Sequence, residues 1–235
     1  MIEVRNLKKS FAGHTVIHGV SFDVARNEVV GLIGPNGAGK TTIIQLMSGA
    51  YHADSGSVTL DGKDITKVRP DRISHLGLAR TFQQPRPFAR MTAAENVMVA
   101  ALSRRRQVGA AREVARECLD FVGLAAQADT PAAVMSTGQR KRLELARAMA
   151  TRPAVYLLDE VTSGVDERTT DVLVALIVRL REYGATILFV EHDLSLMRQL
   201  CGRLIALDLG QIIAQGTPAD VLSDARVVES YVGTE

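Results

Sequence analysis

The chain has 235 residues, of which 46% are hydrophobic and 23% charged. This length suffices for a genuine core, and the composition excludes collagen-like, low-complexity and wholly disordered proteins. Lys and Arg total 28 against 26 Asp and Glu, so the net charge is +2. Because that charge is too small for a dedicated nucleic-acid-binding surface, we predict no nucleic-acid partner.

The cysteine pattern and the lack of targeting signals suggest where the protein works. Cys118 and Cys201 stand far apart without metal or disulfide spacing, which suits a reducing compartment. No stretch approaches the roughly 18 to 20 uninterrupted apolar residues of a membrane-spanning helix. The N-terminus alternates like a strand and lacks the basic-then-apolar pattern of a signal peptide. We therefore expect the chain in the cytoplasm.

In the first part of the chain, β-branched and apolar residues cluster into short runs that end at turn residues. They predict strands at 1–5, 15–24, 28–33, 57–60, near 65 and at 77–82. A glycine-rich turn follows residue 33, and apolar spacing then predicts a helix at 40–47. The Asp61-Gly62 turn makes part of this region antiparallel.

From residue 92 the pattern becomes helical and later alternates. The Ala-rich stretch 92–122 predicts helices broken near Gly109 and Gly123, and the Arg104, Arg105 and Arg106 trio is interpreted as a solvated helix face. Further helices are predicted at 140–149, 166–181, 194–200 and 217–223, with strands at 155–158, 185–190 and 203–209. This rhythm predicts an α/β fold with a mainly parallel sheet.

A phosphate-binding loop joins the strand at 28–33 to the helix at 40–47. It matches G-x-x-x-x-G-K-[ST] with Gly34, Pro35, Asn36, Gly37, Ala38, Gly39, Lys40 and Thr41. The glycines let backbone N–H groups and a helix N-terminus surround a phosphate, while Lys40 reaches the outer phosphates and the Thr41 hydroxyl ligates Mg²⁺. The predicted ligand is a nucleoside triphosphate.

Two acids complete this half of the site. The apolar strand at 155–158 ends in Asp159 and Glu160. Asp159 is predicted to face the Mg²⁺, and Glu160 to orient and deprotonate water. The alternative is that Glu160 is an ordinary surface residue at a strand end.

A second anion site is predicted at 135–139. Ser136, Thr137, Gly138 and Gln139, followed by Arg140, Lys141 and a long helix, resemble the signature motif of ATP-binding cassette (ABC) ATPases. Ser136, the Gly138 backbone and a helix N-terminus would bind phosphate, but too far along the chain to serve its own phosphate loop. The resemblance implies that ATP is buried between two subunits arranged head to tail, so one chain alone should hydrolyse it poorly.

Other cassette features occur in the family's order. By resemblance, Phe11 would stack on adenine, Gln83 would contact Mg²⁺ and the attacking water, Asp166 would reach the partner subunit, and His192 would touch the γ-phosphate. Phe11 as a core aromatic, Gln83 as a solvated loop residue and His192 as a structural histidine are the alternatives. Thr137 departs from the family's usual glycine and Val161 from its usual proline.

The resemblance covers nearly the whole chain and groups the residues by role. It implies catalytic residues Lys40, Gln83, Glu160 and His192; metal ligands Thr41, Gln83 and Asp159; and ATP contacts from Phe11 and from residues 34–42, the last being Thr42. The implied fold is a P-loop NTPase of the ABC type, a single domain over 1–235. Residues 1–85 and 151–235 would form the nucleotide-binding core with an antiparallel β subdomain, and 86–150 a helical subdomain.

The segment 78–96 resembles the ATPases of branched-chain amino acid importers. Phe82, Phe88 and Met91 interleave with arginines there, which suits a groove for a short helix of a membrane subunit. The alternative is that these aromatics pack internally.

The resemblance implies transmembrane permease subunits, a second ABC ATPase that is either a copy or a relative, and indirectly a solute-binding protein. The chain would be peripheral on the cytoplasmic face of the cell membrane. Pro87 and Asp166 depart from the importer pattern, so the solute stays open among amino acids and other small polar molecules. The other candidate is a soluble ABC ATPase of a cytosolic assembly complex without a permease.

Overall fold

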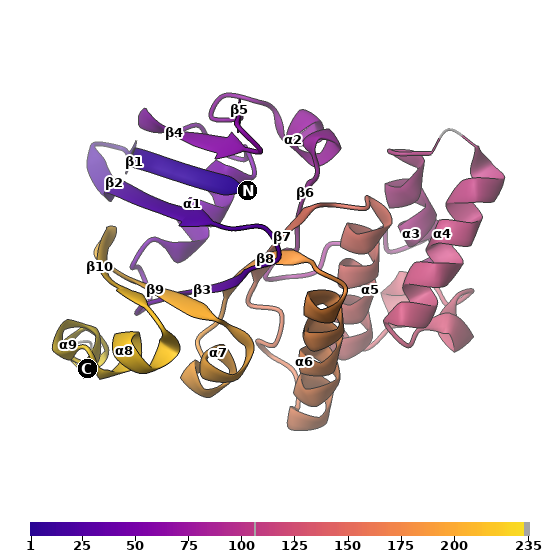
Figure 1. Cartoon of the computed structure of the whole chain (residues 1–235). Helices are drawn as coiled ribbons and strands as arrows, with labels where there is room; N and C mark the ends of the chain where they lie inside the picture. The colour runs from indigo at the N-terminus through magenta and orange to yellow at the C-terminus, as the bar shows by residue number, and fades with distance from the viewer. Residues whose placement is uncertain (106, 233–235) are drawn as a thin grey trace.

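The structure, a computed structural model, describes residues 1–105 and 107–232 (Figure 1). Its strands are β1 (Ile2–Phe11), β2 (His14–Val24), β3 (Val29–Ile33), β4 (Ser55–Leu60), β5 (Lys63–Asp64), β6 (Leu78–Arg80), β7 (Val155–Asp159), β8 (Thr186–Val190), β9 (Arg203–Asp208) and β10 (Gln211–Gly216). Its α-helices are α1 (Lys40–Met47), α2 (Pro70–Leu76), α3 (Ala93–Leu102), α4 (Val108–Phe121), α5 (Thr137–Ala150), α6 (Glu167–Glu182), α7 (Leu194–Leu200), α8 (Pro218–Ser223) and α9 (Ala225–Val232). Within these residues no helix has the length and apolar character needed to cross a bilayer.

The central sheet has the strand order β10-β9-β3-β8-β7-β6. Neighbouring strands are parallel except β10, which pairs antiparallel with β9, so the predicted α/β fold with a mainly parallel sheet is confirmed. β3 is buried on both faces, as a central parallel strand requires. Val30 and Leu32 pack toward the antiparallel sheet, whereas Val29 and Ile33 pack toward the helices of the opposite face.

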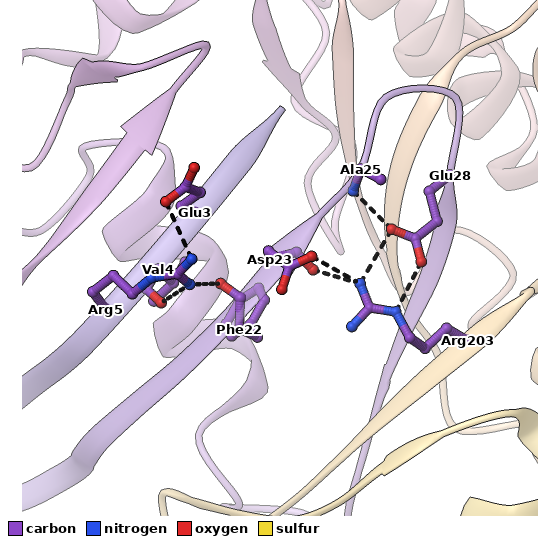
Figure 2. Close-up of polar contacts among 8 residues, drawn as sticks. All are labelled: Glu3, Val4, Arg5, Phe22, Asp23, Ala25, Glu28 and Arg203. Atoms are coloured by element: carbon purple, nitrogen blue, oxygen red, sulfur yellow. Dashed lines mark hydrogen bonds and ion pairs between the residues drawn. The ribbon is translucent and has the colours of Figure 1, made fainter.

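The predicted antiparallel region is the second sheet, of order β2-β1-β4-β5. Helix α1 lies between the two sheets and buries Ile43, Ile44 and Met47 there (Figure 1). Arg203 at the start of β9 ties the sheets together from the edge. Its Nε donates to Glu28 Oε1 at 2.8 Å and its Nη2 to the Asp23 carbonyl at 2.6 Å, which fixes the turn between β2 and β3 (Figure 2).

Helices α3, α4 and α5 pack against one another at one end of the molecule (Figure 1). The predicted breaks near Gly109 and Gly123 are both found: α3 ends at Leu102 and α4 begins at Val108, which places Gly109 in the first turn of α4, and α4 ends at Phe121. A glycine in a first turn costs little when the following turns bury an apolar face, here that of Ala111, Val114, Ala115, Cys118 and Leu119.

The arginine trio also differs from its prediction. Arg104 donates two hydrogen bonds of 2.7 Å, to the carbonyls of Ser74 and His75 at the end of α2. It therefore binds the carboxyl end of a helix, where a cation is favoured, rather than forming part of a solvated helix face. Arg105 is exposed as predicted, and Arg106 lies outside the described residues. The sequence reading also missed α2, β10 and α9.

Candidate functional site

The phosphate-binding loop lies between β3 and α1, as predicted. Gly39 precedes α1 with a φ of 103°, a conformation that favours glycine. A Cβ on Gly34 would stand 2.1 Å from the Leu207 carbonyl oxygen of β9, so a side chain is excluded there. Residues 36–42 line a hollow of about 220 Å³ whose other wall includes Glu160 and His192. The first N–H groups of α1 have no partner within the helix. The first turn of α1 also carries no acidic side chain, so this helix end suits an anion.

Lys40 is almost completely buried in this loop. Its Nζ donates to the carbonyls of Gly34 and Pro35 at 2.6 and 2.9 Å. Burial lowers the pKa of Lys40, and the charges of Glu160 and Asp159 oppose that shift. The ammonium therefore stands where it can meet phosphate, beside both predicted acids.

Asp159 ends β7 and is 1% exposed. Arg80 of β6 donates from Nη2 to Asp159 Oδ2 at 3.1 Å, whereas Asp159 Oδ1 is buried with no hydrogen-bond partner among the described residues. Burial raises the pKa of Asp159, and the Arg80 charge opposes that increase. Asp159, Thr41 and Gln83 line one hollow of about 360 Å³. The three predicted metal ligands are thus brought together, with one carboxylate oxygen unused.

Glu160 is the residue on which the predicted catalytic side chains converge. Gln83 Nε2 donates to Glu160 Oε2, and His192 Nε2 lies 2.7 Å from Oε1. Because an ionised carboxylate only accepts, the proton of this second contact belongs to His192 Nε2. Gln83 and His192 are both exposed, and both contact the Glu160 carboxylate.

The backbone at Glu160 is held in an unusual conformation. Its φ is 48°, in the left-handed region that non-glycine residues rarely adopt. The Glu160 N–H donates to the Val190 carbonyl at 2.9 Å, and Lys141 Nζ, buried on α5, donates to the Glu160 carbonyl at 2.9 Å. Contacts from β8 and α5 therefore hold the Glu160 backbone in this conformation.

The signature residues lie at the start of α5, away from the phosphate-binding loop of the same chain. Ser136 caps the helix: its hydroxyl accepts from the Gln139 N–H at 3.2 Å, and Gln139 Oε1 accepts from the Ser136 N–H at 2.8 Å. Ser136 and Thr137 are exposed, whereas Gly138 packs so closely on α6 that a Cβ would stand 2.6 Å from Thr169 Cγ2. The α5 N-terminus therefore faces outward in this chain.

Asp166 and Phe11 lie at the edges of the site. Asp166 caps α6 by accepting from the Thr169 N–H at 3.0 Å and from its hydroxyl at 2.9 Å, and these bonds lower the pKa of Asp166. The Phe11 ring packs edge-on against Tyr51, with centroids 5.1 Å apart, and stays partly exposed at the end of β1. Phe11 is thus outside the core, where a base could stack on it.

Arg80 and Lys141 are site residues whose roles the sequence reading missed. Arg80 pairs with Asp159, and Lys141 holds the Glu160 carbonyl. A signal for each was present: Arg80 is a lone charge beside Leu78 and Ala79 in an apolar strand, and Lys141 shares helical spacing with the buried Leu145. Charges at buried positions indicate an internal partner, but not which one.

Comparison with known proteins identifies the class that this fold and site define. The family model described as ABC transporter matches residues 17–163, and one described as Branched-chain amino acid ATP-binding cassette transporter matches residues 211–235. The chain belongs to the ABC transporter family and is an ATP hydrolase of the ABC type.

Particular relatives match over nearly their full length. The chain is 36% identical to the high-affinity branched-chain amino acid transport ATP-binding protein BraF of Pseudomonas aeruginosa, covering 99% of this chain and 98% of that one. It is 35% identical to the lipopolysaccharide export system ATP-binding protein LptB of Haemophilus influenzae, covering 100% and 98%.

Solved structures match the fold equally well. The ADP conformation of an ATP-binding cassette of an ABC transporter superposes with a TM-score of 0.89 at 32% identity, covering 99% of this chain and 98% of that one. A dimeric cassette in a post-hydrolysis state with ADP and Pi superposes with a TM-score of 0.84 at 26% identity, covering 93% and 99%.

Proposed function

We propose that the chain binds ATP and Mg²⁺ at the phosphate-binding loop and hydrolyses ATP to drive a membrane transporter that imports branched-chain or other amino acids. The observation that carries the catalytic part is the convergence of Gln83 and His192 on Glu160, opposite residues 36–42. The soluble assembly ATPase is not favoured, because the matching relatives are ATP-binding proteins of transport systems.

The residues fit a magnesium ion. The free Oδ1 of Asp159, the Thr41 hydroxyl and the Gln83 amide oxygen are hard oxygen donors around one hollow, the kind that Mg²⁺ prefers. When bound, Mg²⁺ would neutralise charge on the phosphate oxygens. Arg80 keeps Asp159 Oδ2 engaged and leaves Oδ1 for the ion.

The catalytic step is assigned to Glu160. Its carboxylate takes the proton of the attacking water as general base, and Gln83 and His192 hold the carboxylate in place. Lys40, backbone N–H groups within 36–42 and the Thr42 side chain bind the phosphates, and Phe11 stacks on the adenine. His192 is also placed to contact the γ-phosphate, because it lines the same hollow.

A second ATPase subunit, a copy or a relative, is proposed to complete the site with Ser136, Thr137, Gly138 and Gln139. The support is the exposed N-terminus of α5, whose residues do not line the hollow formed by 36–42 of the same chain. Asp166, exposed beside it on α6, would lie at the same interface. A head-to-tail pair then gives two equivalent sites.

The proposed contact with the permease is a groove of about 350 Å³ between the central sheet, α2, α3 and α5. Its walls include Arg80, Phe82, Glu144 and Arg147. Phe82 is 44% exposed at its rim, and Phe88 is 46% exposed beside Arg147, whose guanidinium stands 5.4 Å from the Phe88 ring. Both aromatics are thus available to a short helix from a membrane subunit, which would hold the chain on the cytoplasmic face.

The amino-acid class of solute is supported by the C-terminal family match at 211–235 and by BraF. It implies a solute-binding protein on the other side of the membrane. LptB, at 35% identity, favours lipopolysaccharide export as the second candidate. Within the proposed function, residues 1–235 act as one ABC ATPase domain, with the helical subdomain at 86–150 and the core in the remainder.

Two measurements test this function. Phosphate release from Mg²⁺-ATP by the purified chain should rise per chain as protein concentration rises, because the complete site needs two subunits. A rate independent of concentration would argue against the two-subunit site.

The second measurement is affinity purification from detergent-solubilised membranes of the source organism, followed by mass spectrometry. Polytopic permease subunits in stoichiometric amounts are expected, with or without a second cassette ATPase. The ligand of their companion solute-binding protein would then distinguish amino-acid import from lipopolysaccharide export. Recovery of soluble proteins alone would contradict the proposed transporter.

A further inference from the structure

The C-terminal helix α9 reaches the phosphate-binding loop. It packs next to α8 and β10 at one edge of the central sheet (Figure 1). Val227 is 2% exposed, and Tyr231, one helical turn later, is partly buried against the same core. Val228 and Val232 face away and are exposed. Two side chains of one face therefore anchor the helix.

Tyr231 makes a specific contact with the first residue of the loop. The Gly34 N–H donates to Tyr231 Oη at 2.8 Å. Gly34 is buried, and its carbonyl accepts from Lys40 Nζ at 2.6 Å. The N–H of Gly34 is thus held by Tyr231, and its carbonyl is held by Lys40, the lysine predicted to meet phosphate. The contact spans 197 residues of sequence, from the end of the chain to its nucleotide site.

We propose that Tyr231 is a positioning residue for ATP, acting through Gly34 on the loop conformation and on the location of the Lys40 ammonium. The proposal deepens the proposed function and rests on it, because it takes the loop to bind ATP phosphates. It gives the C-terminal segment a role in the nucleotide site, whereas the motifs of this site all lie before residue 193.

The hydroxyl, rather than the ring, carries the effect. Phenylalanine at 231 would keep the apolar contact with the core but leave the buried Gly34 N–H without its acceptor. An unsatisfied buried donor is costly, so the loop would shift to recover a hydrogen bond. The Leu207 carbonyl blocks movement of Gly34 toward β9. The shift would therefore go the other way and would displace the Gly34 carbonyl that holds the Lys40 ammonium.

The test compares three variants of the full-length chain. Calorimetric titration with the non-hydrolysable analogue AMP-PNP and Mg²⁺ should show about 3- to 10-fold weaker binding for Tyr231→Phe, the effect of one lost hydrogen bond. Tyr183→Phe is the matched control, since Tyr183 is 76% exposed. Val227→Ala removes the other anchor of α9 and should lower Tm while leaving the affinity within about twofold.

The outcomes separate the inference from the proposed function. If the wild type and Tyr183→Phe bind the analogue but Tyr231→Phe binds equally well, the inference is overturned and the proposed function stands. If Val227→Ala weakens binding as much as Tyr231→Phe, the role of Tyr231 is only to pack α9, which also overturns it. Failure of the wild type to bind would refute both.

Hydrogen–deuterium exchange gives a readout that needs no nucleotide. The amides of Gly34 and of residues 36–40 should exchange faster in Tyr231→Phe than in the wild type or Tyr183→Phe. Unchanged exchange in this loop would contradict the proposal.

Discussion

The phosphate-binding loop with its two acids and the N-terminus of α5 are the two halves of the proposed ATP site. They differ in how many of their contacts are already made within a single chain. At the phosphate-binding loop, Lys40, Asp159 and Glu160 are each 7% exposed or less and are held by contacts from the loop after β3, from β6, from β8 and from α5. At the N-terminus of α5, Ser136 and Thr137 are exposed, and Ser136 contacts its own helix. The first half is organised before nucleotide arrives, whereas the second, in the proposed two-subunit site, would offer its N–H groups to the nucleotide of the other subunit. Binding and turnover should therefore respond to different residues.

The largest separation of binding from turnover is expected at Glu160. Glu160→Gln should slow phosphate release about 10²- to 10⁴-fold, because an amide cannot accept the proton of water. ATP binding should persist, and the ATP-bound dimer should accumulate in size-exclusion chromatography. Glu182→Gln, an exposed acid at the end of α6, is the control. Near-normal turnover would exclude Glu160 as the base.

The buried organisation of the first half predicts a large stability effect at Arg80. Arg80→Gln removes the partner of Asp159, whose side chain is 1% exposed, and should lower the free energy of unfolding by about 3 kcal/mol. Arg226→Gln breaks a surface pair with Asp224 and should cost less than about 1 kcal/mol. Urea denaturation measures both. Equal losses would show that the buried contact does not organise the site.

At the exposed half we expect the reverse of the Arg80 result. A substitution there should lower turnover without lowering stability or nucleotide binding by a single chain. Ser136→Asp keeps a good helix cap but puts a negative charge where the partner's phosphate is expected. Phosphate release should fall about 10- to 100-fold, while the analogue affinity of the monomer and the Tm stay close to wild type. Thr151→Ala, at the other end of α5, is the control. A matching loss of monomer affinity would refute the division of the site.

The same division explains what the sequence could predict. The loop at 34–42 is a local structure, so its strand, glycines and helix were all visible in consecutive residues. The capping box that starts α5 at Thr137, three residues before the predicted start, is also local, and its Ser-x-x-Gln pattern could have been recognised.

The contacts of the acids were not predictable in this way. Arg80 meets Asp159 because β6 pairs with β7, and Glu160 meets His192 because β7 pairs with β8. Alternating helices and strands predict a parallel sheet, but the order β3-β8-β7-β6 depends on how those strands pack. The residues could therefore be named from motifs, while the hydrogen bonds that orient them required the fold.

The smallest expected effect is a difference in how the two halves respond to pH. Glu191, 3% exposed, accepts from the Thr162 N–H and hydroxyl at 2.7 and 2.8 Å, and burial raises the pKa of Glu191 above its ordinary 4.5. Its favourable contribution is complete below the unfolded pKa and is lost as pH rises through the folded value. The free energy of unfolding of Glu191→Gln should therefore increase relative to that of the wild type as pH rises from 5 to 8.

Asp166, on the exposed half, should show no such trend. Its pKa is lowered by the Thr169 hydrogen bonds, so its contribution is present above the unfolded value and is lost only as pH falls through the folded one. The stability offset between Asp166→Asn and wild type should then stay constant from pH 5 to pH 8. Urea denaturation across this range compares the two offsets. A flat Glu191→Gln offset would mean that burial at this half does not shift the carboxyl, and a sloping Asp166→Asn offset would mean that the exposed cap is not formed in solution.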